Sequence, residues 1–260
     1  MPLRSLPVPG TTFFLLAGAA VLLGSAVQSA VGLGLGLVAA PVFVVLEPSL
    51  MPGTLLTTTV LLPLLTVRAE WRHVDWHGLR WGLPARLPGA VAGAWLLTAT
   101  DPRLLGALVG SMVLVAVAAS LYGTRRAGGP GAEVGQGTRR FSPAALVAVG
   151  AAAGLTGTAT SIAGPPLALL YQRQPPARVR ATLGGFFLGG TLISLLTLAG
   201  AGELTARQVG TGLLLVPFVV AGFAAGRPLA RRLGPARLRT AVLAVVSLSG
   251  AALLVRSLPL

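Results

Sequence analysis

The chain carries the same Gly/Pro-interrupted apolar pattern twice, about half its length apart. The first copy reads VGLGLGLVAAP over 31–41, and the second reads GTATSIAGPP over 157–166. A second repeat follows later in each half, at 88–93 (PGAVAG) and 217–222 (PFVVAG). Both stretches place Val-Ala-Gly at the same distance after a Pro. Duplicated halves, each with an interrupted apolar segment, are typical of membrane proteins whose binding site lies at the interruptions.

Composition supports a membrane location. Of the 260 residues, 54% are hydrophobic and only 10% are charged, whereas soluble domains carry roughly 25% charged residues. The chain therefore lacks the polar surface of a soluble domain, and we predict an all-α integral membrane protein. Its first apolar run has a weak likeness to a signal peptide, but the run continues to residue 46 and has a mid-chain counterpart at 143–172. We therefore expect it to be retained.

The apolar segments predict about eight membrane-spanning helix equivalents. Two pairs of segments surround the interruptions, at 11–31 with 32–46 and at 143–160 with 161–172. The second pair has only 30 residues, while two full crossings need about 40, so we expect a re-entrant, broken helix pair. Each half also has three segments long enough to span the bilayer, at 51–67, 78–98, 103–122, 183–199, 207–226 and 236–257.

Arginine positions predict the topology. The formal net charge is +14 and no Lys is present, and the Arg residues cluster in the loops 68–86, 123–142, 173–182 and 227–239. The positive-inside rule places these loops in the cytoplasm, so each broken pair must return to its starting side. The halves are then inverted repeats, 1–122 and 143–260, joined by a cytoplasmic linker at 123–142, with both termini outside. Because the Arg residues lie in short loops, we predict no nucleic-acid partner.

The two interruptions are the candidate substrate site. Glycine exposes backbone amides and proline removes a donor, so helices break there, and half-helix amides attract anions. Close helix packing is the alternative role for the glycines, and bonding to the helix backbone is the alternative for the hydroxyls. The expected substrate-binding residues are Gln28, Gly32, Gly34, Gly36, Pro41, Thr57, Thr58, Gly157, Thr158, Ser161, Gly164, Pro165 and Thr182.

Charged residues indicate a binding site less clearly than the two interruptions do. Arg86, Arg178 and Arg180 lie beside predicted spans, where they either attract anions to an inner vestibule or simply anchor the topology. All six acidic residues lie in or beside predicted loops, so a proton relay has no evident carrier other than Glu47 or the substrate itself. His73, Asp75 and His77 could bind a metal, but an interfacial loop is the simpler interpretation. We therefore predict no metal, no cofactor and no enzymatic activity.

Four stretches carry a resemblance to a known family. They are VGLGLGLVAAP, the Asp75-Trp76 pair before a span, GLTGTATSIAGPPLALLY at 154–171 and ARVRATLGGFF at 177–187. Together they resemble the TauE/SafE family of sulfite-exporter-like transporters, over nearly the whole chain. The resemblance implies a carrier of sulfite, sulfonates or organic acids in a bacterial cell membrane, working as an exporter. Ala163 departs from the family pattern, because adjacent glycines commonly precede the proline there.

The residues and the resemblance together predict an alternating-access transporter of small anions, with its site between the two breaks. A passive anion channel would share these features and remains the alternative. A membrane-embedded enzyme lacks a visible catalytic pair, and an assembly subunit would need no polar cavity. The coupling ion, a proton or sodium, and the oligomeric state are left open by the sequence.

Overall fold

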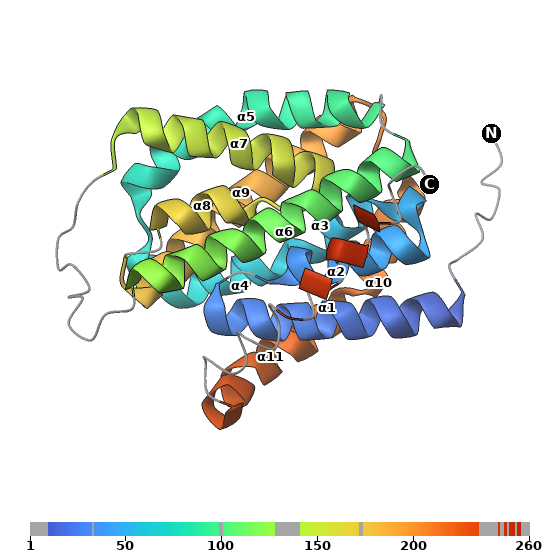
Figure 1. Ribbon diagram of the computed structural model, residues 1–260, viewed down its shortest axis with the longest axis horizontal. Helices are drawn as coiled ribbons and strands as arrows, with labels where there is room; N and C mark the ends of the chain where they lie inside the picture. The colour runs from blue at the N-terminus through green and yellow to red at the C-terminus, as the bar shows by residue number, and fades with distance from the viewer. Residues whose placement is uncertain are drawn as a thin grey trace.

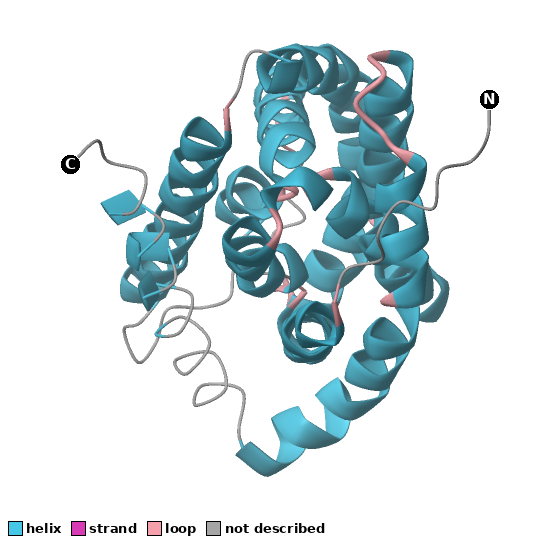
Figure 2. Cartoon of the chain, turned by 90° about the vertical axis from the view of Figure 1, so that its right-hand side faces the viewer, coloured by secondary structure: helices cyan, strands magenta, loops and turns pink. Residues whose placement is uncertain are grey.

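The structure, a computed structural model, describes residues 10–32, 34–98, 101–127, 141–171 and 174–233, with a few further positions between 244 and 255. Every regular element in these residues is a helix, and they contain no β-strand (Figure 2). The expected all-α class is therefore confirmed. The longest helices lie side by side along the long axis of the molecule (Figure 1).

The first half of the chain forms six α-helices. The chain breaks at the predicted Gly-rich segment. A second division lies at Val60, between α3 and α4, although Val60 itself has helical dihedral angles. Short 3-10 turns occupy 48–50 and 71–73. The helices are α1 (Thr11–Val31), α2 (Leu35–Leu46), α3 (Gly53–Thr59), α4 (Leu61–Glu70), α5 (Trp76–Thr98) and α6 (Pro102–Ala127).

The second half begins as the first does, with a long helix, a break and a short helix. It then differs, because an undivided long helix follows where the first half has the divided pair α3 and α4, and the next helix is divided at Leu215. The predicted segment at 236–257 lies largely outside the described residues. The helices are α7 (Pro143–Thr160), α8 (Gly164–Tyr171), α9 (Pro176–Gly200), α10 (Ala206–Leu214) and α11 (Val216–Leu233).

Both interruptions predicted from Gly and Pro are confirmed as helix breaks, and both begin in the same way. Gly32, directly after α1, has a φ of 99°, and Ser161, directly after α7, has a φ of 61°. These left-handed residues turn the chain, and their N–H groups bond to the carbonyls of Gln28 and Gly157. Glycine adopts this conformation freely, whereas a serine pays roughly 1–2 kcal/mol.

Two helix pairs hold the halves together. α5 packs along α7 and α1 packs along α11, so each half contributes one helix to each pair. Glycines allow the backbones to approach, because a Cβ at Gly93 would lie 2.6 Å from the carbonyl oxygen of Leu155, and Gly222 lies against the carbonyl of Leu22. Small residues at such seams are the usual way in which helices pack in membranes.

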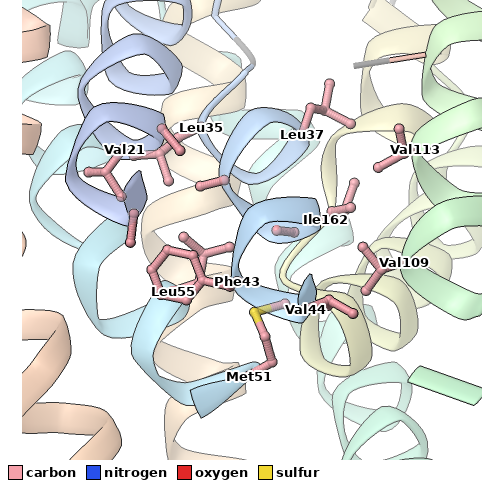
Figure 3. Close-up of a cluster of buried hydrophobic side chains, with 14 of the residues drawn as sticks. Val21, Leu35, Leu37, Phe43, Val44, Met51, Leu55, Val109, Val113 and Ile162 are labelled. Atoms are coloured by element: carbon pink, nitrogen blue, oxygen red, sulfur yellow. The ribbon is translucent and has the colours of Figure 1, made fainter. Parts of the chain in front are cut away.

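The largest apolar cluster lies around α2 and joins both halves. Leu35, Phe43 and Leu55 are fully buried there, against Val109 of α6 and Ile162 from the second break (Figure 3). Inside a bilayer such side chains stabilise the fold mainly through close van der Waals packing, because lipid tails are as apolar as they are. Most of α2 is thus packed against protein, as a broken helix inside a bilayer requires, although Val45 near its end is 49% exposed.

Apolar side chains also cover the outside of the helices. Leu15, Trp95 and Leu196 are 67%, 72% and 73% exposed. Four helical stretches are long and apolar enough to cross a membrane, namely Thr11–Ser29, Pro143–Thr160, Ala177–Gly200 and Ala206–Gly226. An apolar outer surface on long apolar helices fits lipid as the surrounding solvent.

Two boundaries differ from those expected, and a third is close. α5 begins at Trp76, two residues before the span expected at 78–98, and stays helical through Pro84 and the part of the Arg-rich segment 68–86 that overlaps it. α6 continues to Ala127 through the first part of the expected linker at 123–142, of which 128–140 lie outside the described residues. α9 begins at Pro176, seven residues before the expected span at 183, because Pro is favourable in the first turn of a helix.

Candidate functional site

The two helix breaks meet in the middle of the fold. A Cβ added at Gly36 would lie 2.6 Å from the carbonyl oxygen of Ser161, so the first turn of α2 touches the second break directly. Gln28 spans the first break by accepting a hydrogen bond of 3.0 Å from the Leu35 N–H. The Ser161 hydroxyl donates to the carbonyl of Pro52 at 3.2 Å, which ties the second break to the start of α3.

A small pocket of about 50 Å³ opens where the breaks meet. One buried water needs about 10–15 Å³ by the same measure, so the pocket has room for a solute of about four heavy atoms. It brings together residues from both halves of the chain. Its lining residues are Gln28, Gly34, Gly36, Leu37, Leu56, Thr59, Pro63, Arg86, Gly157, Ser161, Ile162, Ala163, Gly164, Phe187 and Thr191.

Arg86 is the ionisable residue among these lining residues. It lies near the middle of α5 and is only 1% exposed, which makes it the largest fully buried side chain in the described residues. Its Nε has no hydrogen-bond partner, and its Nη1 donates to the Phe186 carbonyl over a long 3.5 Å. No carboxylate pairs with it in the described part of the chain. Buried charges in proteins are normally paired, so this guanidinium points to an anionic ligand.

Two glycines make room for this guanidinium. A Cβ at Gly157 of α7 would lie 2.7 Å from Arg86 Nη2. A Cβ at Gly190 of α9 would overlap the guanidinium carbon itself. Side chains at these two positions would occupy the space of the arginine head group, so the hollow around Arg86 depends on both helices.

Backbone amides contribute less than the sequence suggested. The first N–H of α2, that of Leu35, is already bonded to Gln28. In α8, Pro165 and Pro166 directly follow Gly164 and have no N–H to offer. The positive charge at the pocket therefore comes mainly from Arg86, which was expected at the cytoplasmic end of a span and lies instead inside α5. The residues before Arg86 suggested a loop in the sequence, because they include Arg80, Trp81 and Pro84.

Six residues of the expected substrate set line the pocket, and the remaining seven do not. The four threonines of the second group have protein partners. Thr57 and Thr58 donate to carbonyls one turn earlier, and Thr58 also approaches the Gly212 carbonyl at 3.2 Å. Thr158 shares a 2.7 Å hydrogen bond with Ser194, and the Thr182 hydroxyl accepts from the Asp75 N–H at 2.9 Å.

The other three residues of the second group act on the backbone or the core. Gly32 forms the left-handed end of α1 and lies against Arg180, whose Cγ would be 3.2 Å from an added Cβ. Pro41 is buried inside α2, and Pro165 is buried in the first turn of α8. These positions shape the breaks without facing the pocket.

Arg178 and Arg180 lie apart from the pocket, in a polar cluster at one end of the molecule. Arg178 pairs with Asp75 at 3.4 Å, and Arg180 bonds Glu70 through both Nε and Nη2, at 3.2 and 2.8 Å. The Tyr171 hydroxyl donates to Asp75 at 3.1 Å. Asp75 is thus used within this cluster rather than in a metal site with His73 and His77.

A second polar cluster also joins the two halves. Arg207 pairs with Glu47 at 3.7 Å, and the Gln208 side chain donates to the carbonyl of Ser49 at 3.1 Å. Glu47, a candidate proton carrier by sequence, therefore lies in this pair. The first cluster joins the segment near 70–75 to the segment near 174–182. The second cluster joins the segment near 47–51 to the segment near 205–208.

Sequence reasoning missed several lining residues, of which Phe187 and Thr191 are the clearest. Phe187 and Thr191 are one helical turn apart on α9, so they share a face. The only sequence signal for these two lining residues was a polar residue one turn from an aromatic residue in an apolar helix, which is a weak signal.

Comparison with known proteins identifies the family of the chain. The family described as Sulfite exporter TauE/SafE matches residues 16–253. The chain is 27% identical to the probable sulfite/organosulfonate exporter TauE of Cupriavidus necator, over 89% of this chain and 90% of the relative. It is also 27% identical to the probable inner membrane transporter protein TsaS of Comamonas testosteroni, over 71% of this chain and 74% of the relative.

No solved structure matches the chain with significance. The family match covers most of the sequence, including both helix breaks and the whole pocket. The apolar helices and the inner-membrane relative agree on a multi-pass membrane protein. The chain belongs to the sulfite exporter TauE/SafE family of membrane proteins.

Proposed function

We propose that this chain exports small anions, such as sulfite, organosulfonates or organic acids, across a bacterial cell membrane by alternating access. The observation that carries the proposal is the buried, unpaired Arg86 in a pocket between the two helix breaks. A low-dielectric pocket with one fixed positive charge attracts an anion strongly. The relatives named as exporters of sulfite and organosulfonates support this class of substrate.

The size of the pocket fits the proposed substrates. Its volume of about 50 Å³ holds about four heavy atoms, which is the size of sulfite or of a sulfonate head group. Apolar lining residues, among them Leu56 and Phe187, suit the short carbon chain of an organosulfonate. The Thr191 hydroxyl can donate to an oxygen atom of the anion, as polar groups do in a largely apolar site, whereas the Thr59 and Ser161 hydroxyls donate to the Leu56 and Pro52 carbonyls.

The directions of α1 and α7 support the mechanism. α1 runs from right to left in Figure 1 and α7 from left to right, although both lead into a break with a left-handed end. Each of these two helices also packs along a helix of the other half, in the pairs α1–α11 and α5–α7. We propose that residues 1–122 and 143–260 are inverted repeats with about eight span equivalents, that the broken pairs α1–α2 and α7–α8 are re-entrant, and that the linker is cytoplasmic.

The polar clusters fit this topology. The cluster of Glu70, Asp75, Arg178 and Arg180 joins two loops that the arginine distribution assigns to the cytoplasm. The cluster of Glu47 and Arg207 joins two loops assigned to the outside. We propose that opening one cluster while the other stays closed gives the pocket access to one side at a time. Ion pairs at both ends are suitable for such a two-state change, since they can break and re-form.

Counterflow in proteoliposomes tests the proposal. Vesicles loaded with unlabelled sulfite should accumulate labelled sulfite transiently and saturably, and proton or sodium gradients identify the coupling ion. A Gly34→Leu variant should insert normally but lose flux, because a Cβ at Gly34 already lies 2.8 Å from Val27. Gly210→Leu, at a position with open space, is the matched control and should transport normally.

Two results would contradict the proposal. Flux without counterflow or saturation would identify a passive anion channel instead of a carrier. Normal flux in Gly34→Leu would show that the break is not part of the transport path.

A further inference from the structure

We infer that the pocket accepts its anion in the singly charged form, because Arg86 is the countercharge and a second one is missing from the described lining residues. This inference rests on the proposed function and specifies the charge state of its substrate. It would make the protein a carrier of hydrogensulfite, sulfonates and monocarboxylates, which discriminates against sulfite dianion and sulfate.

Arg86 supplies one fixed positive charge. A guanidinium stays protonated in proteins, so the charge does not depend on pH. It is 1% exposed, and its Nε lacks any partner in the described part of the chain. The glycines at 157 and 190 pack around the head group and leave no space there for a second side chain.

The other charged groups are remote from Arg86 or already paired. The helices α1, α2, α3 and α7 contain no titratable side chain in their described ranges. Asp75 lies directly before α5 and eleven positions before Arg86, which is about 16 Å along the helix axis. Titratable groups of the elements around the pocket are Arg68 and Glu70 on α4, His77 and Arg80 on α5, Tyr171 on α8, and Arg178 and Arg180 on α9.

Those groups gather towards one end of the molecule. Glu70 bonds Arg180, and Asp75 bonds both Arg178 and Tyr171. Arg68 and Arg80 are exposed, and His77 stands at the start of α5. None of them lines the pocket, so none can neutralise a second negative charge there or take up a proton from the bound anion.

Charge balance then decides which anions bind. A monoanion beside Arg86 forms a neutral pair in the low-dielectric interior. A dianion would leave one negative charge without compensation, which is strongly unfavourable away from water. Sulfite gains a proton near neutral pH to become hydrogensulfite, whereas sulfonates are monoanions at every physiological pH. The proton would thus travel on the substrate, without a titratable relay in the pocket.

Binding measurements on the full-length protein in detergent test this inference. Ligand-induced thermal stabilisation gives apparent dissociation constants for methanesulfonate, sulfite and sulfate between about pH 6 and about pH 9. Methanesulfonate should bind equally at each pH. The apparent dissociation constant for sulfite should rise about tenfold for each pH unit above the substrate's own pKa. Sulfate should bind at least about tenfold more weakly than methanesulfonate at every pH.

Two variants identify the countercharge. Arg86→Lys keeps one positive charge and should keep the preference for monoanions, with weaker binding. Arg86→Gln should lose anion binding while its melting temperature without ligand is maintained, because it removes an unpaired buried charge. Gly200→Ala, in open space on α9, should bind as the unsubstituted protein does.

The outcomes separate this inference from the proposed function. Sulfite binding that is independent of pH, sulfate binding as tight as that of methanesulfonate, or full anion binding by Arg86→Gln would overturn the charge selection while saturable transport stands. Absence of both anion binding and counterflow would instead overturn the proposed function.

Discussion

At the residue scale, the pocket depends on what surrounds one arginine. Arg86 has a place inside α5 because Gly157 and Gly190 face it from two other helices. The guanidinium has few protein partners, so its position is set mainly by the shape of this hollow. Small changes in the neighbouring glycines should therefore affect anion binding more than changes in most pocket hydroxyls.

Gly190→Ala tests this dependence. The added methyl group would overlap the guanidinium carbon of Arg86 and force the head group out of its hollow. We expect at least about a tenfold loss of anion affinity and a loss of stability of about 1–3 kcal/mol from overpacking. Methanesulfonate binding and thermal melting measure the two effects.

Gly200→Ala is the control on the same helix, because a Cβ there has nothing within 4 Å. It should leave both quantities within experimental scatter. If Gly190→Ala binds anions with normal affinity, the hollow does not position Arg86 in the way the structure indicates.

The sequence predicted some of these residues and not others, for physical reasons. Gly34, Gly36 and Gly164 were found because breaks in an apolar helix need Gly and Pro. Arg86 was placed in a vestibule, since an arginine between two prolines reads as a loop end. Thr182 was placed in the site because hydroxyl chemistry alone cannot tell whether a group faces a substrate or, as here, the Asp75 backbone.

At the element scale, the glycine seam between α5 and α7 fixes the wall that carries Arg86. Gly82, Gly89 and Gly93 on α5 face Gly150 and Gly154 on α7 or the backbone beside them. Most of these contacts are with backbone atoms, which cannot move aside as a flexible side chain can. The pair should therefore behave as one rigid unit.

Gly93→Ala should weaken this unit. Its Cβ would lie 2.6 Å from the Leu155 carbonyl oxygen, so α5 and α7 must separate locally. We expect a destabilisation of about 1–3 kcal/mol, seen as a lower midpoint in thermal melting of the detergent-solubilised protein. Gly210→Ala, at an open position in α10, should be neutral or slightly stabilising because alanine favours helix. Equal midpoints for the two variants would contradict a tight seam.

Element boundaries were predictable where composition changes sharply. The ends of α1, α7 and α8 fall where the Gly and Pro residues indicated. The apolar pattern also located α5, which begins two residues before the span predicted at 78–98 and continues through Pro84, a residue that disfavours a helix interior. The local pattern of apolar residues could not predict which helices pack together. α1 and α11 are far apart in the sequence and come into contact only when the whole chain has folded.

At the scale of the whole molecule, topology can be measured directly because the chain contains no cysteine. Ala201 is exposed between α9 and α10, and Arg72 is exposed between α4 and α5. In the proposed topology the first lies outside and the second in the cytoplasm. Ala201→Cys should react with a membrane-impermeant maleimide in intact cells, and Arg72→Cys should react only after permeabilisation. The reverse labelling pattern would invert the proposed orientation, and labelling of both in intact cells would exclude it.

The pairing of α1 with α11 has a consequence for how the protein is made. α1 ends at Val31, whereas α11 begins at Val216. A ribosome adding roughly 5–20 residues per second leaves on the order of ten seconds or more between them. The first helix must therefore remain in the bilayer with its small-residue face covered by lipid or by another protein until its partner emerges. Its 21 residues without a charged side chain make it stable in the bilayer during that interval, so a helix synthesised much later completes the packing of α1.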